Sequence, residues 1–140
     1  MVTQPKYTTV NIPHKITNAR SVVDYSRDYI YIIGAFANPN ILTFNIKSQK
    51  YESNDLIPNY NTININPDWH CVIPLFDNNN KIQSILSFGG DTSDHFSLLE
   101  RNESRFEWNT NPLCNQSLPY PNVGYLSRAV NINNSLVCVY

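Results

Sequence analysis

The sequence predicts an all-β fold made of a repeated, four-stranded antiparallel unit. One stretch repeats without a gap at an offset of 55 residues, so that 30–52 (IYIIGAFANPNILTFNIKSQKYE) falls on 85–107 (ILSFGGDTSDHFSLLERNESRFE). No window keeps apolar residues at the helical spacing i, i+3, i+4, i+7, and nine prolines interrupt the candidate helices. Short β-branched and aromatic runs bounded by Asn, Asp, Pro and Gly dominate instead, as in strands. Self-similarity at a period of this size indicates a stacked or radial repeat architecture.

Each copy of the repeat divides into four strand-like runs separated by polar turns. In the first copy the expected strands cover 21–25, 29–33, 41–45 and 50–53. In the second copy they cover 71–76, 83–88, 96–100 and 105–108. The first two strands are joined by 26–28 in one copy and by 77–81 in the other, and short polar turns of this kind are typical of hairpins.

Fragments of the same unit flank the two full copies. Residues 6–8 match 50–52, so the chain begins on the last strand of an earlier unit. At the other end, 128–130 match 20–22 and 70–72, and 136–140 match 29–33. We therefore expect four parts, namely the end of a preceding unit, two full units and the start of a further one, at 1–17, 18–58, 68–112 and 126–140. The glycine corresponding to Gly34 and Gly89 would follow the last residue, which indicates a piece of a longer chain.

Composition narrows the classes of partner. The 140 residues suffice for one domain, and a net charge of −1 gives no basic surface for nucleic acid or an anionic membrane. No apolar run is long enough to span a bilayer, and the N-terminus lacks the apolar core of a secretory signal. Three cysteines at unrelated spacings argue against a disulfide framework and favour a reducing compartment. We expect a cytoplasmic protein that binds neither nucleic acid nor membranes.

The repeat carries a family resemblance. The apolar run 85–90 ends in Gly-Gly, Phe44 and Leu99 follow the first glycine by ten positions, and Tyr51 and Phe106 follow seven positions later. This pattern resembles the kelch repeat, whose period is about 50 residues. The chain departs from it where Ala35 replaces the second glycine, where Leu99 replaces an aromatic residue, and where Tyr51 and Phe106 replace tryptophan; Trp108 lies two residues late.

The resemblance implies a segment of a β-propeller, in which four-stranded antiparallel blades radiate around a channel. Propellers close with about four to eight blades, so two blades and two fragments form an incomplete ring. Each open flank would expose an apolar blade face. We therefore expect the remaining blades in the same polypeptide or self-association of this one, and poor solubility of residues 1–140 alone.

Long loops on a rigid scaffold are the expected binding surface. Strand alternation brings the loops between second and third strands to the same face as the loops between units: 35–40, 90–95, 54–69 and 109–127. Trp69 and Tyr120 lie in the inter-unit loops, and aromatic residues are favoured anchors of protein interfaces. The alternative is that both residues only cover the apolar edge of a blade.

Two further groups are candidate binding residues. Arg20, His70 and Arg128 share one repeated position at the start of the innermost strand and would present a cationic rim to an acidic peptide. The alternative is that this position hydrogen-bonds loop carbonyls in every unit. Asp91 and His95 share one loop and could hold a cation or a proton, although a solvated polar turn is the commoner role.

Catalytic signatures are missing from the sequence. His70 and Cys71 are adjacent in a strand and point to opposite faces, so they are unsuited to share a metal ion. The chain contains no Gly-x-Ser-x-Gly elbow, no phosphate-binding glycine loop and no Cys-x-x-Cys pair. We expect no enzyme activity, cofactor or metal, and a non-catalytic scaffold for an unidentified protein partner. The alternatives are an extracellular carbohydrate-binding or enzyme-associated propeller domain, and a gene fragment without a stable fold.

Overall fold

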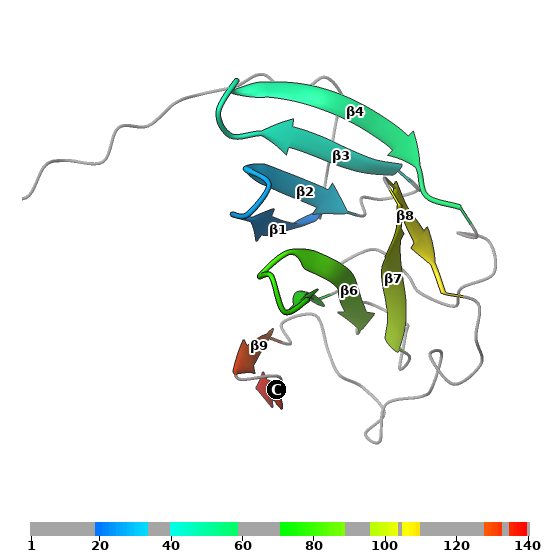
Figure 1. The fold of residues 1–140 in the computed structure, drawn as a ribbon. Coiled ribbons are helices and arrows are strands. Elements are labelled where there is room, and N and C mark those ends of the chain that lie inside the picture. Colours follow the sequence, from blue (N-terminus) through cyan, green and yellow to red (C-terminus); the bar gives the residue numbers. More distant parts are fainter. Residues whose placement is uncertain are drawn as a thin grey trace, which may run out of the picture.

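The computed structural model describes residues 19–33, 40–58, 71–88, 96–103, 105–109, 128–132 and 135–139. Over these residues the chain forms ten strands and no helix, and every paired strand is antiparallel to its neighbour (Figure 1). The all-β prediction and the four-stranded antiparallel unit are confirmed. The expected strand at 6–8 lies outside the described residues.

The first sheet is a meander in the order β1-β2-β3-β4. Its strands are β1 (Arg20–Asp24), β2 (Tyr29–Ile33), β3 (Asn40–Asn45) and β4 (Lys50–Leu56). The second sheet repeats this order with β5 (Cys71–Phe76), β6 (Ile82–Phe88), β7 (Phe96–Asn102) and β8 (Arg105–Trp108). A two-stranded third sheet pairs β9 (Arg128–Ile132) with β10 (Ser135–Val139).

Four hairpin turns of the first two sheets lie wholly or partly among the described residues, and each uses a residue in the left-handed region. The residues are Asp28, Gln49, Asn80 and Glu103, with φ between 52° and 59°. Glycine is the usual choice there because it has no Cβ. The chain has only four glycines and uses other residues in these turns, and a polar side chain adds local hydrogen bonds. Asp77, for example, accepts from the backbone N–H of Lys81 at 2.9 Å across its own turn.

The first strands of the three sheets lie next to one another in chain order. Strand β1 contacts β5, and β5 contacts β9. In Figure 1 the first sheet, in blue to cyan, lies above the second, in green to yellow, and β9 lies below β6. The described sheets form an open series and do not close on one another.

The register of β1 and β5 corrects the expected match between them. Arg20 lies opposite Ile33, and Cys71 lies opposite Phe88, the residue that the repeat equates with Ile33. Cys71, and not His70, therefore holds the place of Arg20. The reason is the β5–β6 hairpin, where a register shift between Leu75 and Phe76 changes the spacing.

The third sheet also departs from the expected match. Arg128 lies opposite Val139. The repeat equates Val139 with Ile32, whose partner is Ser21 and not Arg20. The prediction that Arg20, His70 and Arg128 share one repeated position is therefore wrong.

The last hairpin of each sheet breaks the gap-free repeat as well. Tyr51 lies opposite Phe44 in the first sheet, whereas Trp108, and not Phe106, lies opposite Leu99 in the second. The cause is the position of the turn: strand β7 continues to residue 102 before a two-residue turn, whereas β3 ends at residue 45 before a four-residue turn. Trp108 is thus the structural counterpart of Tyr51.

The core lies between the first two sheets. Side chains of the first sheet meet those of the second in one apolar cluster, with no member more than 4% exposed: Val22, Tyr31, Ile33, Ile41, Ile57, Ile82, Ile85, Leu99, Phe106 and Trp108. A backbone bond from the N–H of Trp108 to the Pro58 carbonyl, at 3.2 Å, joins the two sheets at one edge. Face-to-face packing of this kind excludes water from both inner faces.

The two sheets pack through non-equivalent faces. Ile85 and Leu99 lie opposite each other and are fully buried against the first sheet. Their counterparts Ile30 and Phe44 also lie opposite each other, but on the outer face of the first sheet, where both are partly exposed. The second sheet therefore covers the first with the type of face that stays partly exposed in the first sheet at Ile30 and Phe44.

Candidate functional site

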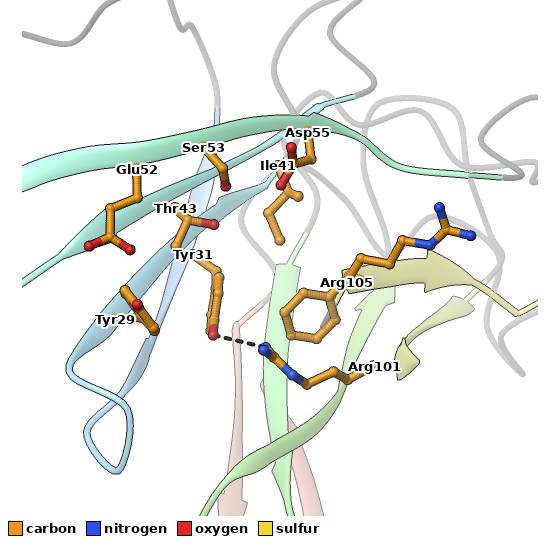
Figure 2. A pocket seen from close by; sticks show the side chains of 10 residues that line it. Tyr29, Tyr31, Ile41, Thr43, Glu52, Ser53, Asp55, Arg101 and Arg105 are labelled. Carbon is orange, nitrogen blue, oxygen red and sulfur yellow. Dashed lines mark hydrogen bonds between the residues drawn. The ribbon is translucent and has the colours of Figure 1, made fainter. Parts of the chain in front are cut away.

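A pocket of about 330 Å³ lies between the first two sheets (Figure 2). Strands β2, β3 and β4 form one wall, and β7 and β8 form the other. The lining is mostly polar and aromatic: Tyr29, Tyr31, Ile41, Thr43, Glu52, Ser53, Asp55, Arg101, Arg105 and Phe106. The pocket contains both signs of charge, with carboxylates on the first sheet and guanidinium groups on the second.

Arg101 is the most firmly positioned charged group of the pocket. Its Nη1 donates a hydrogen bond to the Tyr31 hydroxyl at 2.9 Å, drawn as a dashed line in Figure 2. The guanidinium carbon lies 5.9 Å from the ring centre of Tyr31 and 5.3 Å from that of Phe106, within the range of cation–π attraction. The two rings meet edge to face at 5.0 Å. Arg101 is thus held on a buried aromatic support.

The local structure of the second sheet explains this placement. Arg101 lies directly opposite Phe106 in the β7–β8 pair. It shares a strand face with Leu99, whose side chain is fully buried in the core between the sheets. The inner face of β7 therefore carries Arg101 from the apolar core into the pocket.

Tyr31 has an altered acidity because of its surroundings. Burial raises the pKa of its hydroxyl, and the charge and hydrogen bond of Arg101 only partly oppose this effect, so the net pKa is raised. The hydroxyl therefore stays protonated and accepts from Arg101 as a neutral group.

Glu52 is fixed on the opposite wall. It is the extra residue of a β-bulge, because Thr43 pairs with Ser53 whereas the adjacent Phe44 pairs with Tyr51. Bulges redirect single side chains, often at sites. The Glu52 carboxylate accepts a hydrogen bond from the Asn45 amide at 2.7 Å.

Tyr29 supports the same carboxylate. Its hydroxyl donates to Glu52, and this hydrogen bond, with the negative charge of Glu52, raises the pKa of Tyr29. The Tyr29 and Tyr31 rings lie side by side, with centres 6.1 Å apart. Tyr29 and Tyr31 are thus neighbours on one face of β2, and the first interacts with Glu52 at one end of the pocket whereas the second interacts with Arg101 at the other.

The opposite charges of the pocket do not pair with each other. Within the described residues the ion pairs are Arg27 with Asp24 and Lys47 with Asp28, and none involves a pocket residue. No guanidinium nitrogen of the pocket lies within 4.0 Å of a carboxylate oxygen of another described residue. Hydrogen-bonding capacity on both walls is therefore left for a ligand.

A second polar cluster fixes the two sheets relative to each other. The Asp24 carboxylate, fully buried, accepts hydrogen bonds from the Ser26 hydroxyl at 2.7 Å, from Arg27 Nη1, and from the backbone N–H of Ile82 in the second sheet at 3.2 Å. Arg27 also donates to the Ile82 carbonyl at 3.3 Å. We call these four residues the inter-sheet clip.

The clip sets the acidity of Asp24. Burial alone would raise the pKa of its carboxyl group, but the three hydrogen bonds and the charge of Arg27 outweigh it, so the pKa lies below its ordinary value of 3.8. Asp24 is therefore charged at neutral pH, and its role is to hold the two walls of the pocket together.

Most residues expected to bind a partner lie outside the described part of the chain, namely Trp69, His70, Asp91, His95 and Tyr120. Arg128 begins β9, in a part where only the backbone is described. Arg20 is described and partly buried, and its Nη1 donates to the carbonyl of Ala19 at 3.5 Å. Arg20 does not line the pocket.

The pocket residues were not singled out from the sequence as a site. Glu52, Arg105 and Phe106 help to align the repeats, but neither they nor Arg101 are among the binding residues expected from the sequence. For Arg101 the available signal was a charged residue directly after the expected strand 96–100, where the repeat places the apolar Ile46; Glu52 falls on Glu107 and carries no such signal.

Comparisons with known proteins found no match. No family model matches it, and no curated protein or solved structure does so. Among the described residues, no helix is long and apolar enough to cross a membrane. The same residues contain no group of three or more His, Cys, Asp or Glu side chains placed to hold a metal ion.

Proposed function

We propose that this chain is a segment of a kelch-type β-propeller that serves as a non-catalytic, cytoplasmic module for binding another protein. The observation that carries the proposal is the packing of the two sheets. Each is a four-stranded meander, they pack through non-equivalent faces, and their first strands lie next to each other. Radial stacking of blades has these three properties.

Contacts between non-equivalent faces have a geometric consequence. When each unit uses one face to bind a different face of its neighbour, the same contact can add further units until a ring closes or an open stack forms. The outer face of the first sheet has partly exposed Ile30 and Phe44, whose counterparts are fully buried in the second sheet. A further blade, in the same polypeptide or in another copy of it, would bury this face.

Trp108 adds support for the kelch type. Tryptophan is usual in the last strand of the kelch pattern, and Trp108 lies two residues from the position expected for it in the sequence. In the sheet it faces Leu99 as Tyr51 faces Phe44, so the displacement is absorbed by the β7–β8 turn. The departure from the pattern at this residue is thus one of spacing only.

Protein binding is favoured over carbohydrate binding by the aromatic residues of the pocket. A sugar ring would need an accessible aromatic face. Tyr31 and Phe106 are only 3% and 4% exposed, and Arg101 lies over both rings. Tyr29 is partly exposed, but its hydroxyl interacts with Glu52. The exposed side chains of the pocket, Glu52, Asp55 and Arg105, are all charged and suit the side chains of a protein partner.

One experiment tests the propeller part of the proposal. We expect residues 1–140 to self-associate in light scattering coupled to size exclusion, and Ile30→Glu to reduce that association because it places a charge on the uncovered face. Ile85→Glu, at the fully buried counterpart, is the matched control and should unfold the chain. A compact, soluble natural monomer with a cooperative thermal transition would contradict the incomplete ring.

A second experiment tests the binding part. The full chain is immobilised and offered a phage-displayed library of random peptides and, separately, an array of glycans. Reproducible enrichment of related peptides supports a protein-binding module. Binding to glycans alone, or to neither class, would overturn it.

A further inference from the structure

We propose that the pocket between the first two sheets binds a peptide that carries an acidic and a basic side chain close together. Arg101 receives the carboxylate, and Glu52 receives the basic group. The inference rests on the proposed protein-binding function and assigns that binding to one place. It also fixes the chemistry of the ligand, which protein binding in general does not.

The anion half of the pocket is preorganised. The Arg101 guanidinium has five N–H donors, and one nitrogen is held by the Tyr31 hydroxyl at 2.9 Å. Its position over two buried rings leaves few rotamers to lose when a ligand binds. The planar fork of Arg101 favours a carboxylate, which it can bind through two parallel hydrogen bonds. Exposed Arg105, from the neighbouring strand, adds positive charge to this wall.

The cation half is built in the same way from the opposite wall. The Asn45 amide and the Tyr29 hydroxyl orient the Glu52 carboxylate, which has two oxygens and thus further acceptor sites. Exposed Asp55, from the same strand, adds a second negative charge. Figure 2 shows Glu52 and Asp55 on the β4 ribbon, across the pocket from Arg101.

The separation of the charges identifies the class of ligand. An anion alone would meet Arg101 but also two carboxylates, and a cation alone would meet Glu52 but also two guanidinium groups. Because the two walls do not form ion pairs with each other, a ligand with both charges satisfies both walls. The volume of about 330 Å³ is enough for side chains and lies at the lower end of ligand sites.

The test uses four fluorescent peptides that differ only at two positions. The sequences are GSGEGKSG, GSGEGQSG, GSGQGKSG and GSGQGQSG, and affinity for residues 1–140 is measured by anisotropy or by biolayer interferometry at low surface density. We expect the Glu–Lys peptide to bind about ten-fold tighter than either singly charged peptide, because one charge-assisted hydrogen bond contributes about that difference in affinity. The uncharged peptide should bind most weakly.

Protein variants locate the contacts. Arg101→Gln should weaken binding of Glu-containing peptides about ten-fold and leave the others unchanged, and Glu52→Gln should do the same for Lys-containing peptides. Glu103→Gln, in an exposed turn outside the pocket, and Arg20→Gln, at the rim expected from the sequence, are the controls. Circular dichroism confirms that each variant is folded.

Several outcomes would overturn the inference. One is equal affinity for all four peptides, which needs no protein variant to be observed. Another is tight binding that Arg20→Gln abolishes and Arg101→Gln does not, which would place the site at the strand starts. Peptides selected from a random library that bind independently of Arg101 and Glu52 would leave the protein-binding function intact and remove this pocket from it.

Discussion

The inter-sheet clip predicts that a single uncharged substitution loosens the two walls of the pocket. In Asp24→Asn the remaining side-chain oxygen can still accept from the Ile82 N–H, but the negative charge beside Arg27 is lost. Breaking a buried ion pair costs about 3–5 kcal/mol. Arg27 is 24% exposed, and one hydrogen bond is retained, so we expect a loss of about 2 kcal/mol in the free energy of unfolding. Asp24→Ala should cost about 3–4 kcal/mol, because the buried Ile82 N–H then also loses its acceptor.

Urea unfolding followed by tryptophan emission measures this loss, since Trp108 lies in the core between the sheets. The transition is recorded at several protein concentrations to separate unfolding from association. Asp77→Asn is the matched control, because its carboxylate accepts only from Asn79 and Lys81 within its own turn. Its effect on the free energy of unfolding should be much smaller than that of Asp24→Asn.

Amide hydrogen exchange adds a local measurement. The Ile82 N–H should exchange faster in Asp24→Ala than in the natural chain, because its acceptor is removed. Equal destabilisation by Asp24→Asn and Asp77→Asn, with unchanged exchange at Ile82, would refute the view that Asp24 joins the sheets.

Three further predictions follow from the same contacts. The folded-state pKa of Asp24 lies below 3.8, so its stabilising effect is present above pH 3.8 and is lost as the pH falls through the lowered value. The free energy of unfolding should therefore fall more steeply in acid for the natural chain than for Asp24→Asn. Tyr31→Phe removes the acceptor of Arg101 and keeps the ring, and should cost about 1 kcal/mol in calorimetry. Trp108→Ala should cost about 3–5 kcal/mol in urea unfolding, and Tyr51→Ala less, because Trp108 is buried and Tyr51 only partly so.

The strands of both units could be predicted because their ends are marked locally. Runs of β-branched and aromatic residues stop at Asp, Asn and Gly, and the expected second strand 29–33 coincides with β2. The second strand of the other unit begins one residue earlier than expected, at Ile82. Local side-chain chemistry marks most of these ends, but β4 and β7 continue to residues 56 and 102, beyond the expected ends at 53 and 100.

Register could not be predicted in the same way. The match of Tyr51 with Phe106 assumed hairpins of constant length, and the match of Arg20 with His70 allowed a longer turn but is off by one residue, so both are wrong in the sheets. A one-residue shift moves a side chain to the other face of a strand, whereas a two-residue shift keeps the face and changes the depth. The gap-free repeat aligns Arg101 with Ile46, which lies in a turn, and so does not reveal that Arg101 lies on the inner face of a strand.

The two anchors of the proposed pocket stand where the repeat is irregular. Glu52 is the extra residue of a bulge in β4, and Arg101 belongs to the extension of β7 beyond the end of its counterpart β3. If β7 ended where its counterpart β3 does, Arg101 would be a turn residue and would not extend the inner face of β7 into the space between the sheets. Irregularities that a sequence-level rule fails to capture tend to mark functional sites. Here both occur in one contact between two sheets, on facing walls and with opposite charge. This coincidence is the strongest reason to assign binding to the pocket and not to the repeated strand starts.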